Sequence, residues 1–236
     1  MKRACLILAF LLICGAAESF AQDARIFMQV RPQVASGITL DKSESALQTT
    51  ADHSYTHAQG SLTNGIAIVI VMWVPNASTS CTATYGGDAM TLIEEKSQDG
   101  AYLVSIFKKD LGSAGSGNKT VVVDFNSTMY KSFVVSLTYS GVAQDTAYTD
   151  GGSGSNWSTA PALTLATATD SLVVGGLATG NLTVTNNDTV IAQDTSAGQK
   201  FSAQYAAGTG GNVTLDWTLS TNNAWAVAGV VLTKAD

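Results

Sequence analysis

Apolar and polar residues alternate with a period of two along most of this chain. In Val213–Leu219, Val, Leu, Trp and Leu alternate with Thr, Asp and Thr, and Ser132–Tyr139 follows a similar pattern. This period predicts β-strands with one buried and one wet face. After the first 21 residues, no stretch repeats its apolar residues with the 3.6-residue period of a helix, so the chain is predicted to be all-β. The candidate strands are Arg25–Arg31, Ile66–Val74, Cys81–Tyr85, Met90–Glu95, Tyr102–Lys108, Lys119–Phe125, Ser132–Tyr139, Ala162–Ala166, Ser171–Leu177, Thr189–Gln193, Val213–Leu219 and Trp225–Leu232.

Two candidate strands differ from this pattern because they are apolar on both faces. Ile66–Val74 alternates Ile, Ile, Ile and Met with Ala, Val, Val and Trp, and Trp225–Leu232 is apolar throughout with small Ala and Gly residues. Such a strand requires a cover on its outer side. One interpretation is that the segment before residue 60, or a long loop, supplies this cover. The other is that the outer faces form a subunit or domain interface, which makes them the expected surfaces of self-association.

Turn residues separate the candidate strands at short intervals. Tyr85-Gly86-Gly87-Asp88 joins two short runs, and glycine at both central positions permits the positive φ of a tight hairpin turn. Many short strands with this punctuation predict an antiparallel β-sandwich, of jelly-roll or Ig-like type, rather than a parallel α/β sheet. The Gly/Ser/Asn-rich stretch Asp150–Thr159 is interpreted as a long loop within a single domain (22–236), because no clear internal repeat is visible.

The one long apolar run that does not alternate lies at the N-terminus. Two basic residues precede the run Ala4–Ile13, and Ser19-Phe20-Ala21 then places small residues where a signal peptidase requires them. This pattern predicts a signal peptide over 1–21, with cleavage before Gln22. The run is too short for stable membrane insertion. We therefore expect a secreted or cell-surface, extracellular protein.

Charge and cysteine content narrow the classes of partner and of stabilisation. The chain has 12 basic and 18 acidic residues, and after the leader the charges are mostly scattered singly, with Lys108-Lys109 as the longest basic run. Without a basic cluster, the chain is not suited to neutralise phosphates, so no nucleic-acid partner is expected. Cys5 and Cys14 belong to the leader and only Cys81 follows it, so no internal disulfide is expected.

Histidine is the scarcest of the residues that support acid–base or metal chemistry. The chain has only His53 and His57, in a segment that reads as extended. Residues four apart in a strand lie roughly 13 Å from each other, too far to share a metal ion without a third ligand between them. A structural or hydrogen-bonding role is therefore expected for His57.

The chain shows no recognisable catalytic pattern. A glycosidase needs two carboxylates that flank one bond, whereas Glu94 and Glu95 are adjacent and face opposite sides of a strand. The G-x-S-x-G pattern of many serine hydrolases is absent, and Cys81 has no basic neighbour that would lower its pKa. No catalytic residue and no metal site are predicted. A hydrolase whose pair of carboxylates has no recognisable spacing is kept as the least favoured of three functional hypotheses. Aspartates without a telling spacing are Asp124, Asp145, Asp150 and Asp216.

The stretch Asp145–Ser158 carries the residue types of a binding loop. Exposed aromatic rings bind sugars as flat platforms, and Asp and Asn oxygens serve polar contacts or a calcium ion. Trp157, amid Gly, Ser and Asn, is the best candidate for an exposed aromatic. The spacing matches no calcium-loop pattern, and a Trp that anchors the loop to the core is the alternative. The candidate ligand-binding residues are Tyr148, Asp150, Asn156 and Trp157, with calcium as the one cofactor considered.

Several segments together resemble a group of uncharacterised secreted and phage-associated β-sandwich domains. The most distinctive is Ala83–Leu92, where Thr84-Tyr85-Gly86-Gly87-Asp88-Ala89-Met90-Thr91 is similar to a T-Y-G-G-x-x-M/L-T motif. The resemblance spans almost all of the chain after the leader. It implies a β-sandwich and, by analogy, a module of surface or virion proteins, and it carries no established activity or catalytic residues. The other matching segments are Gly37–Asp41, Tyr55–His57, Ser136–Val142, Asp216–Ser220 and Ala224–Val230.

Together these observations favour a secreted, non-enzymatic structural or adhesive module that recognises its partner through loops or a sheet face. The expected partners are further copies of the chain, or a surface or glycan ligand. The alternative is a carbohydrate-binding module, assisted by calcium, that uses the loop around Trp157. The chain has seven Asn-x-Ser/Thr sites. In a eukaryotic host they would indicate surface glycosylation, whereas in a bacterial or phage setting they indicate only that turns beginning with Asn precede Thr-rich strands. They are Asn76, Asn118, Asn126, Asn156, Asn181, Asn187 and Asn212.

Overall fold

The computed structural model describes residues 37–49, 52–77, 80–144 and 148–236. The predicted signal peptide and the candidate strand Arg25–Arg31 lie outside these residues. The protein is all-β: its described residues form antiparallel sheets, as the period of two predicted. In this part of the chain no helix is long and apolar enough to cross a membrane.

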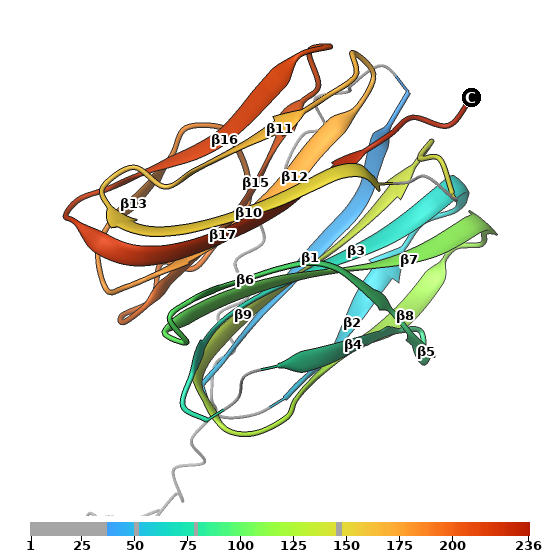
Figure 1. Cartoon of the computed structure of the whole chain (residues 1–236). Helices are drawn as coiled ribbons and strands as arrows, with labels where there is room; N and C mark the ends of the chain where they lie inside the picture. The colour runs from blue at the N-terminus through green and yellow to red at the C-terminus, as the bar shows by residue number, and fades with distance from the viewer. Residues whose placement is uncertain (1–36, 50–51, 78–79, 145–147) are drawn as a thin grey trace, which may run out of the picture.

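The N-terminal half of the chain builds a two-layered sandwich (Figure 1). Its larger sheet has the strand order β1-β9-β3-β7-β6, and its smaller sheet has the order β2-β8-β4-β5. The strands are β1 (Thr39–Gln48), β2 (His53–Gln59), β3 (Leu62–Pro75), β4 (Cys81–Tyr85), β5 (Asp88–Ala89), β6 (Thr91–Gln98), β7 (Tyr102–Ala114), β8 (Gly117–Phe125) and β9 (Met129–Ser140).

The C-terminal half builds a second sandwich. Its larger sheet has the order β10-β17-β12-β15-β14, and its smaller sheet has the order β11-β16-β13. The strands are β10 (Tyr148–Ser158), β11 (Ala162–Ala166), β12 (Leu172–Thr179), β13 (Val184–Asn186), β14 (Thr189–Gln193), β15 (Lys200–Ala207), β16 (Asn212–Leu219) and β17 (Asn223–Leu232).

The two halves share one topology. In each larger sheet, the first strand of the half (β1 or β10) lies at an edge, next to the last strand (β9 or β17), and the third strand (β3 or β12) follows. In each smaller sheet, the second strand (β2 or β11) pairs with the second-to-last (β8 or β16), which pairs with the fourth (β4 or β13). First and last strands that neighbour each other are a feature of jelly rolls. Among the described strands only the two-residue β5 has no counterpart. The sequence shows no clear repeat because the duplication lies in strand order rather than in a recurring residue pattern.

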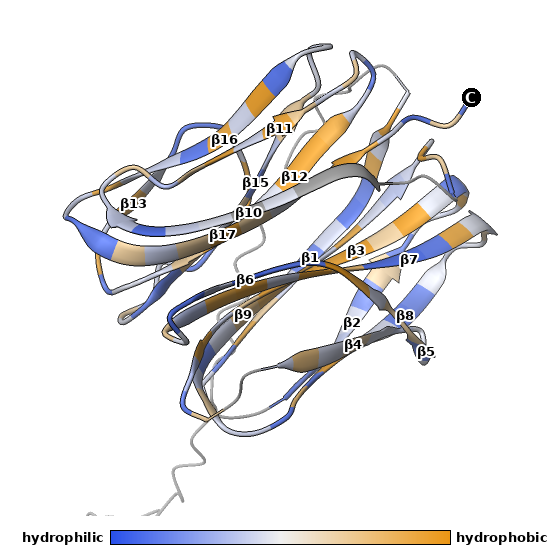
Figure 2. Ribbon diagram, in the orientation of Figure 1, coloured by the Kyte–Doolittle hydropathy of each residue, from blue (hydrophilic) through white to orange (hydrophobic). Residues whose placement is uncertain are grey.

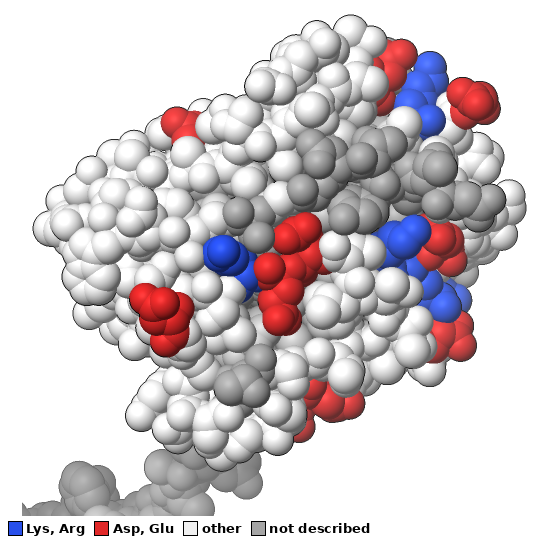
Figure 3. All heavy atoms as spheres, in the orientation of Figure 1, with Lys and Arg blue, Asp and Glu red and all other residues white. Residues whose placement is uncertain are grey.

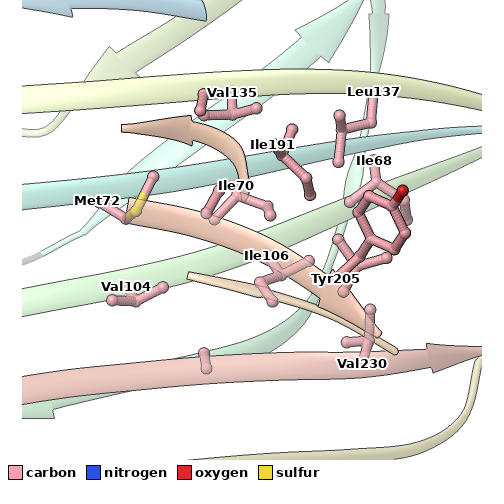
Figure 4. Close-up of a cluster of buried hydrophobic side chains, with 14 of the residues drawn as sticks. Ile68, Ile70, Met72, Val104, Ile106, Val135, Leu137, Ile191, Tyr205 and Val230 are labelled. Atoms are coloured by element: carbon pink, nitrogen blue, oxygen red, sulfur yellow. The ribbon is translucent and has the colours of Figure 1, made fainter. Parts of the chain in front are cut away.

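The two larger sheets pack face to face, so the molecule has four layers, which Figures 1 and 2 show as two stacked sandwiches. Apolar side chains of β3, β7 and β9 meet those of β12, β15 and β17 in what we call the central core. In Figure 4 this core contains Ile68, Ile70 and Met72 from β3 together with Tyr205 and Val230 from the other half. A separate apolar cluster fills each sandwich, between its larger and its smaller sheet.

The four layers account for the two strands that are apolar on both faces. Ile66–Val74 lies in β3 and Trp225–Leu232 in β17, and both strands are buried along these stretches. One face of each strand contributes to the central core, and the other contributes to the cluster inside its own sandwich. The expectation that their outer faces mediate self-association is wrong, because sheets of the same chain cover them. The segment before residue 60 contributes β2 to that cover.

Small residues let the two halves approach each other closely. Gly176 of β12 faces β3: a Cβ at this position would lie 2.7 Å from Ile70 Cγ2 and 3.0 Å from Met72 Sδ. On β17, Ala226 and Ala228 are also fully buried in the central core. The N-terminal half thus presents large side chains on β3 where the C-terminal half presents small ones, which gives close packing across the halves.

One buried ion pair crosses between the halves. Lys131 of β9 and Asp194, which follows β14, are 5 % and 3 % exposed, and Lys131 Nζ lies 2.5 Å from Asp194 Oδ2. The ammonium group also lies 5.7 Å from the centre of the Phe201 ring. Further hydrogen bonds offset the cost of removing the ammonium group from water. Their acceptors are Ser196 Oγ at 3.0 Å, Ala197 O at 3.0 Å and Gln199 O at 2.7 Å.

The stretch Asp150–Thr159, expected to be a long loop, forms most of strand β10 instead. Gly151–Ser158 pairs with β17 in unbroken register. Glycine has a packing role here, because a Cβ at Gly152 would lie 2.8 Å from Leu165 Cδ2 of β11. Glycine in a strand often marks such a close approach, which composition alone does not distinguish from a loop.

Candidate functional site

The four residues predicted to bind a ligand lie on β10, the edge strand of the C-terminal larger sheet. The side chains of Tyr148 and Asp150 lie outside the described part of the structure. Asn156 and Trp157 are both exposed near the end of the strand. Successive residues of a strand point to opposite faces, so the strand separates these two side chains instead of gathering them in one loop pocket.

Trp157 is the large apolar side chain most exposed to solvent among the described residues, at 62 %. Its expected exposure is therefore confirmed, and the alternative of a core anchor is wrong. The anchoring role belongs to Trp225 on the neighbouring strand, whose Nε1 donates to Ser158 Oγ at 3.0 Å. This hydrogen bond ties the end of β10 to β17, so the Trp157 indole projects from a held backbone.

Asn156 contributes a smaller polar group beside this indole. Its Oδ1 accepts a hydrogen bond from the Trp157 backbone N–H at 2.7 Å, which leaves the amide N–H groups as its donors. Within the described residues, no three His, Cys, Asp or Glu side chains are grouped so that they could hold a metal ion.

The two histidines lie on β2 and point into the N-terminal sandwich. His53 Nε2 lies 2.6 Å from Ser132 Oγ, and His57 Nδ1 lies 2.8 Å from Ser136 Oγ. His57 Nε2 lies 3.0 Å from Thr138 Oγ1. The three hydroxyl groups belong to β9, so the histidines connect the smaller sheet to the larger one. The hydrogen-bonding role expected for His57 is confirmed.

The network around His57 continues to β1. Thr138 Oγ1 donates to Asp41 Oδ2 at 3.0 Å, and the Gly60 backbone N–H donates to the same oxygen at 2.8 Å. A hydroxyl group has one proton, so Thr138 accepts from His57 Nε2–H while it donates to Asp41. His57 Nδ1 then accepts from Ser136. The network thereby selects one tautomer of the imidazole.

Asp, His and Ser side chains form a connected network here, yet its imidazole and hydroxyl groups are closed to solvent and only Asp41 is partly exposed. His57, Ser136 and Thr138 are each 0 % exposed. Burial lowers the pKa of both His53 and His57 to about 4, against the opposing charges of Asp52 and Asp41 respectively. The imidazoles are therefore neutral at pH 7 and act as hydrogen-bonding links between sheets.

The partners of these histidines correct one sequence expectation. Ser132, Ser136 and Thr138 alternate with apolar residues, which predicted that they face water. All three are buried, because β2 lies over this face of β9 and its histidines satisfy their hydroxyl groups. Alternation identifies the two faces of a strand but not which polar face receives a second layer.

Cys81, the one cysteine of the described residues, is half-buried and unpaired. Burial, and to a lesser degree the negative charge of Glu95, raise the pKa of its thiol to about 12. The thiol is therefore protonated at neutral pH and unreactive, as expected from its lack of a basic neighbour. Glu95 itself accepts a hydrogen bond from Ser105 Oγ at 2.6 Å.

The structure joins two aspartates that the sequence spacing did not pair. Asp188 lies in the turn between β13 and β14, and its Oδ2 accepts from the backbone N–H of Asp216 and from Gln204 Nε2, both at 3.2 Å. Asn187 Nδ2 donates to Asp216 Oδ2 at 3.1 Å. Partial burial raises the pKa of Asp188, although the hydrogen bond from Asp216 opposes this shift.

This turn borders a shallow, open pocket of about 470 Å³. The pocket is lined by Asn187, Asp188, Thr189, Tyr205, Ala206 and Ala207. The hydrogen bonds of Asp188 and Asp216 link the turn to β15 and β16, so both carboxylates stabilise the turn. A polar triplet Asn186-Asn187-Asp188 indicates a turn in sequence, but nothing in it indicates that Asp216 lies opposite.

The seven asparagines of the Asn-x-Ser/Thr sites are all exposed. This exposure is compatible with both interpretations of these sites, since Asn-led turns also lie at the surface.

Comparisons with known proteins return no relative. No family model matches the chain, and neither a curated protein nor a solved structure matches it. The resemblance to secreted and phage-associated β-sandwich domains therefore stays a prediction.

Proposed function

We propose that this protein is a secreted structural or adhesive module, a rigid body that presents a binding surface. The observation that carries the proposal is the four-layer stack, in which both faces of both larger sheets are packed within one chain. The histidine network and the Lys131–Asp194 pair use buried polar groups to hold layers together. Such a construction suits a protein whose task is to keep its shape.

The distribution of surface charge favours a partner that is not a polyanion. Charged side chains on the face shown in Figure 3 lie in small separate groups, some acidic and some of mixed sign, instead of one large patch. Lys108 pairs with Asp110 and Lys109 with Asp88, which illustrates this mixing. Recognition would therefore use shape, apolar contact and hydrogen bonds more than long-range attraction.

A bead-binding assay tests the structural or adhesive function. Beads that carry residues 22–236 are mixed with identical beads and, separately, with a panel of insoluble polysaccharides and cell-surface extracts. A structural module clusters the beads, and an adhesive module attaches them to one surface. Beads that do neither, while the soluble protein releases sugar from a polysaccharide, would contradict the proposal and favour a hydrolase.

Carbohydrate binding is the second candidate function, and the exposure of Trp157 favours it. A flat indole with an amide beside it suits the apolar face and the hydroxyl groups of a sugar ring. A glycan array probed with residues 22–236 tests this function. Trp157→Ala is expected to lower affinity at least tenfold, as hot-spot aromatic residues do.

The matched control for Trp157→Ala is Tyr130→Ala. Tyr130 is 60 % exposed and lies on β9 of the other half. If both variants bind glycans as the parent does, or both lose binding equally, the site around Trp157 is not the binding site.

A further inference from the structure

We propose that the free edge of β10 is an assembly surface that pairs with β10 of a second copy of this chain. Antiparallel pairing would join the two C-terminal larger sheets into one continuous sheet across a two-fold axis. This inference rests on the proposed structural function and names the surface through which it operates.

The open edge of β10 follows from the sheet order. β10 pairs with β17 on one side, and on its other side none of the described strands pairs with it (Figure 1). The strand is 11 residues long, and the only irregularity in its register lies at its start, between Tyr148 and Asp150. Gly151–Ser158 therefore presents a regular row of backbone donors and acceptors, which is a template for another strand.

The other edge strands of the two larger sheets carry features that oppose strand addition. β6 holds Glu94, Glu95 and Lys96, and its register shifts after Leu92. β1 also carries charged side chains and a shifted register near its start. β14 has five residues and a shift after Val190. Charges, bulges and short length are the usual protections of an edge, and Gly151–Ser158 has none of them.

The charge pattern of β10 identifies a second copy as the partner. Asp150 is its single charged residue and lies near its start. In an antiparallel pair of two β10 strands, the two Asp150 residues lie at opposite ends, so like charges do not face each other. The chain as a whole is acidic, with a net charge of −6, so a strand without charge from Gly151 to Ser158 lowers the repulsion between two copies at this edge.

Trp157 adds a side-chain contact to this pairing. In the antiparallel arrangement, Trp157 of one strand lies across from the Gly- and Ser-rich first part of the other. An aromatic ring that covers a cross-strand glycine stabilises sheets built from such residues. The same pairing would bury the most exposed apolar side chain of the described residues.

Light scattering after size exclusion of residues 22–236 tests the inference. We expect a mass twice that of the chain at micromolar concentration. The double variant Asn156→Lys/Trp157→Lys places two charges at the edge and is expected to raise the dissociation constant at least tenfold. Thr56→Lys, on the edge strand β2 of the N-terminal smaller sheet, is the matched control and should remain a dimer.

Cysteine cross-linking provides a readout that does not depend on weakening the dimer. Two-fold pairing near the middle of this stretch places one residue opposite its own copy: Gly154, when Gly151 lies opposite Trp157, or Ser155, when Gly152 lies opposite Ser158. In a Cys81→Ser background, Gly154→Cys or Ser155→Cys should form a disulfide-linked dimer under mild oxidation, whereas Thr56→Cys should not.

The outcomes separate this inference from the function on which it rests. A monomeric parent chain at about 1 mM would overturn the inference, and beads that attach to a polysaccharide would then leave an adhesive function standing. An oligomer that the β10 lysines do not weaken, and that neither β10 cysteine cross-links, would place assembly on another surface. In that case the β10 inference fails and the structural function survives.

Discussion

At the scale of single residues, polar groups inside the protein act as connections between layers. His57 joins β2 to β9 through Ser136 and Thr138, and Lys131 joins the two halves through Asp194. Buried polar groups of this kind stabilise a fold only when their partners are complete. Removal of one partner, or a change in its protonation, is therefore expected to cost more than the loss of an exposed contact.

The histidines predict acid sensitivity. Their pKa is about 4 in the folded protein and 6.5 when exposed, so between these values the unfolded chain binds more protons. The stability that they contribute is complete above pH 6.5 and is lost as the pH falls toward 4, by up to about 3 kcal/mol per histidine. Urea unfolding at pH 7.5 and pH 4.5 measures this loss. His53→Gln/His57→Gln should show a shallower decline, and an equal decline in both proteins would contradict the assignment.

The buried Lys131–Asp194 pair predicts that substitutions of its two residues have non-additive effects on the free energy of unfolding. Lys131→Met leaves Asp194 buried without its cation and should lower the free energy of unfolding by about 3–5 kcal/mol. Lys131→Met/Asp194→Leu removes both charges and should recover most of that loss. Chemical denaturation measures both effects. Lys108→Met breaks the more exposed pair with Asp110 and should cost about 1 kcal/mol or less.

Sequence patterns foresaw part of this chemistry. The lack of a basic neighbour at Cys81 agrees with the raised pKa of its thiol, and the segment of His53 and His57 is extended, as expected. The Lys131–Asp194 and Asp188–Asp216 contacts could not be foreseen, because the fold joins residues 63 and 28 positions apart. For the candidate site, the sequence identified the exposure of Trp157 but not the strand that carries it.

At the scale of elements, period-two alternation located most strands within a few residues. β4, β11 and β14 have the predicted bounds. The Tyr85–Asp88 turn also has the predicted backbone: φ is +63° at Gly86 and +90° at Gly87, as a tight hairpin between glycines requires. β10 was missed because its Gly- and Ser-rich composition is that of a loop, and its strand conformation depends on pairing with β17.

The packing of β12 against β3 predicts a compensating pair. Gly176→Ala brings a methyl group within 2.7 Å of Ile70 Cγ2, and this overpacking should cost about 1–3 kcal/mol. Ile70→Ala removes Cγ2 itself, so Gly176→Ala/Ile70→Ala should be more stable than the sum of the two single changes implies. Denaturant titrations of the four proteins form the cycle.

The matched control for Gly176→Ala is Gly115→Ala. A Cβ at Gly115 meets nothing within 4 Å, and the change should alter stability by no more than about 0.5 kcal/mol. Equal costs at Gly115 and Gly176 would show that backbone effects, and not contact between the halves, determine the result.

At the scale of the whole molecule, two sandwiches of one topology act as a single body. The central core joins them, and the Lys131–Asp194 pair adds a polar link. Without the other half, each larger sheet would expose one apolar face to water, at a cost of roughly 25 cal/mol for each Å². The duplication resembles a two-fold dimer in which both partners belong to one chain. The fold class was predictable from local pattern, whereas the stacking depends on contacts between residues about 100 positions apart.

Hydrogen exchange of residues 22–236, followed by mass spectrometry at increasing denaturant, tests this unity most directly. The amides of β3 and β12, which lie on either side of the central core, should exchange with the same free energy and the same denaturant dependence. This result would show that the halves open together in one global unfolding step. If β12 exchanges several kcal/mol more readily than β3, the two sandwiches unfold independently, and the account of one four-layer structural unit is wrong.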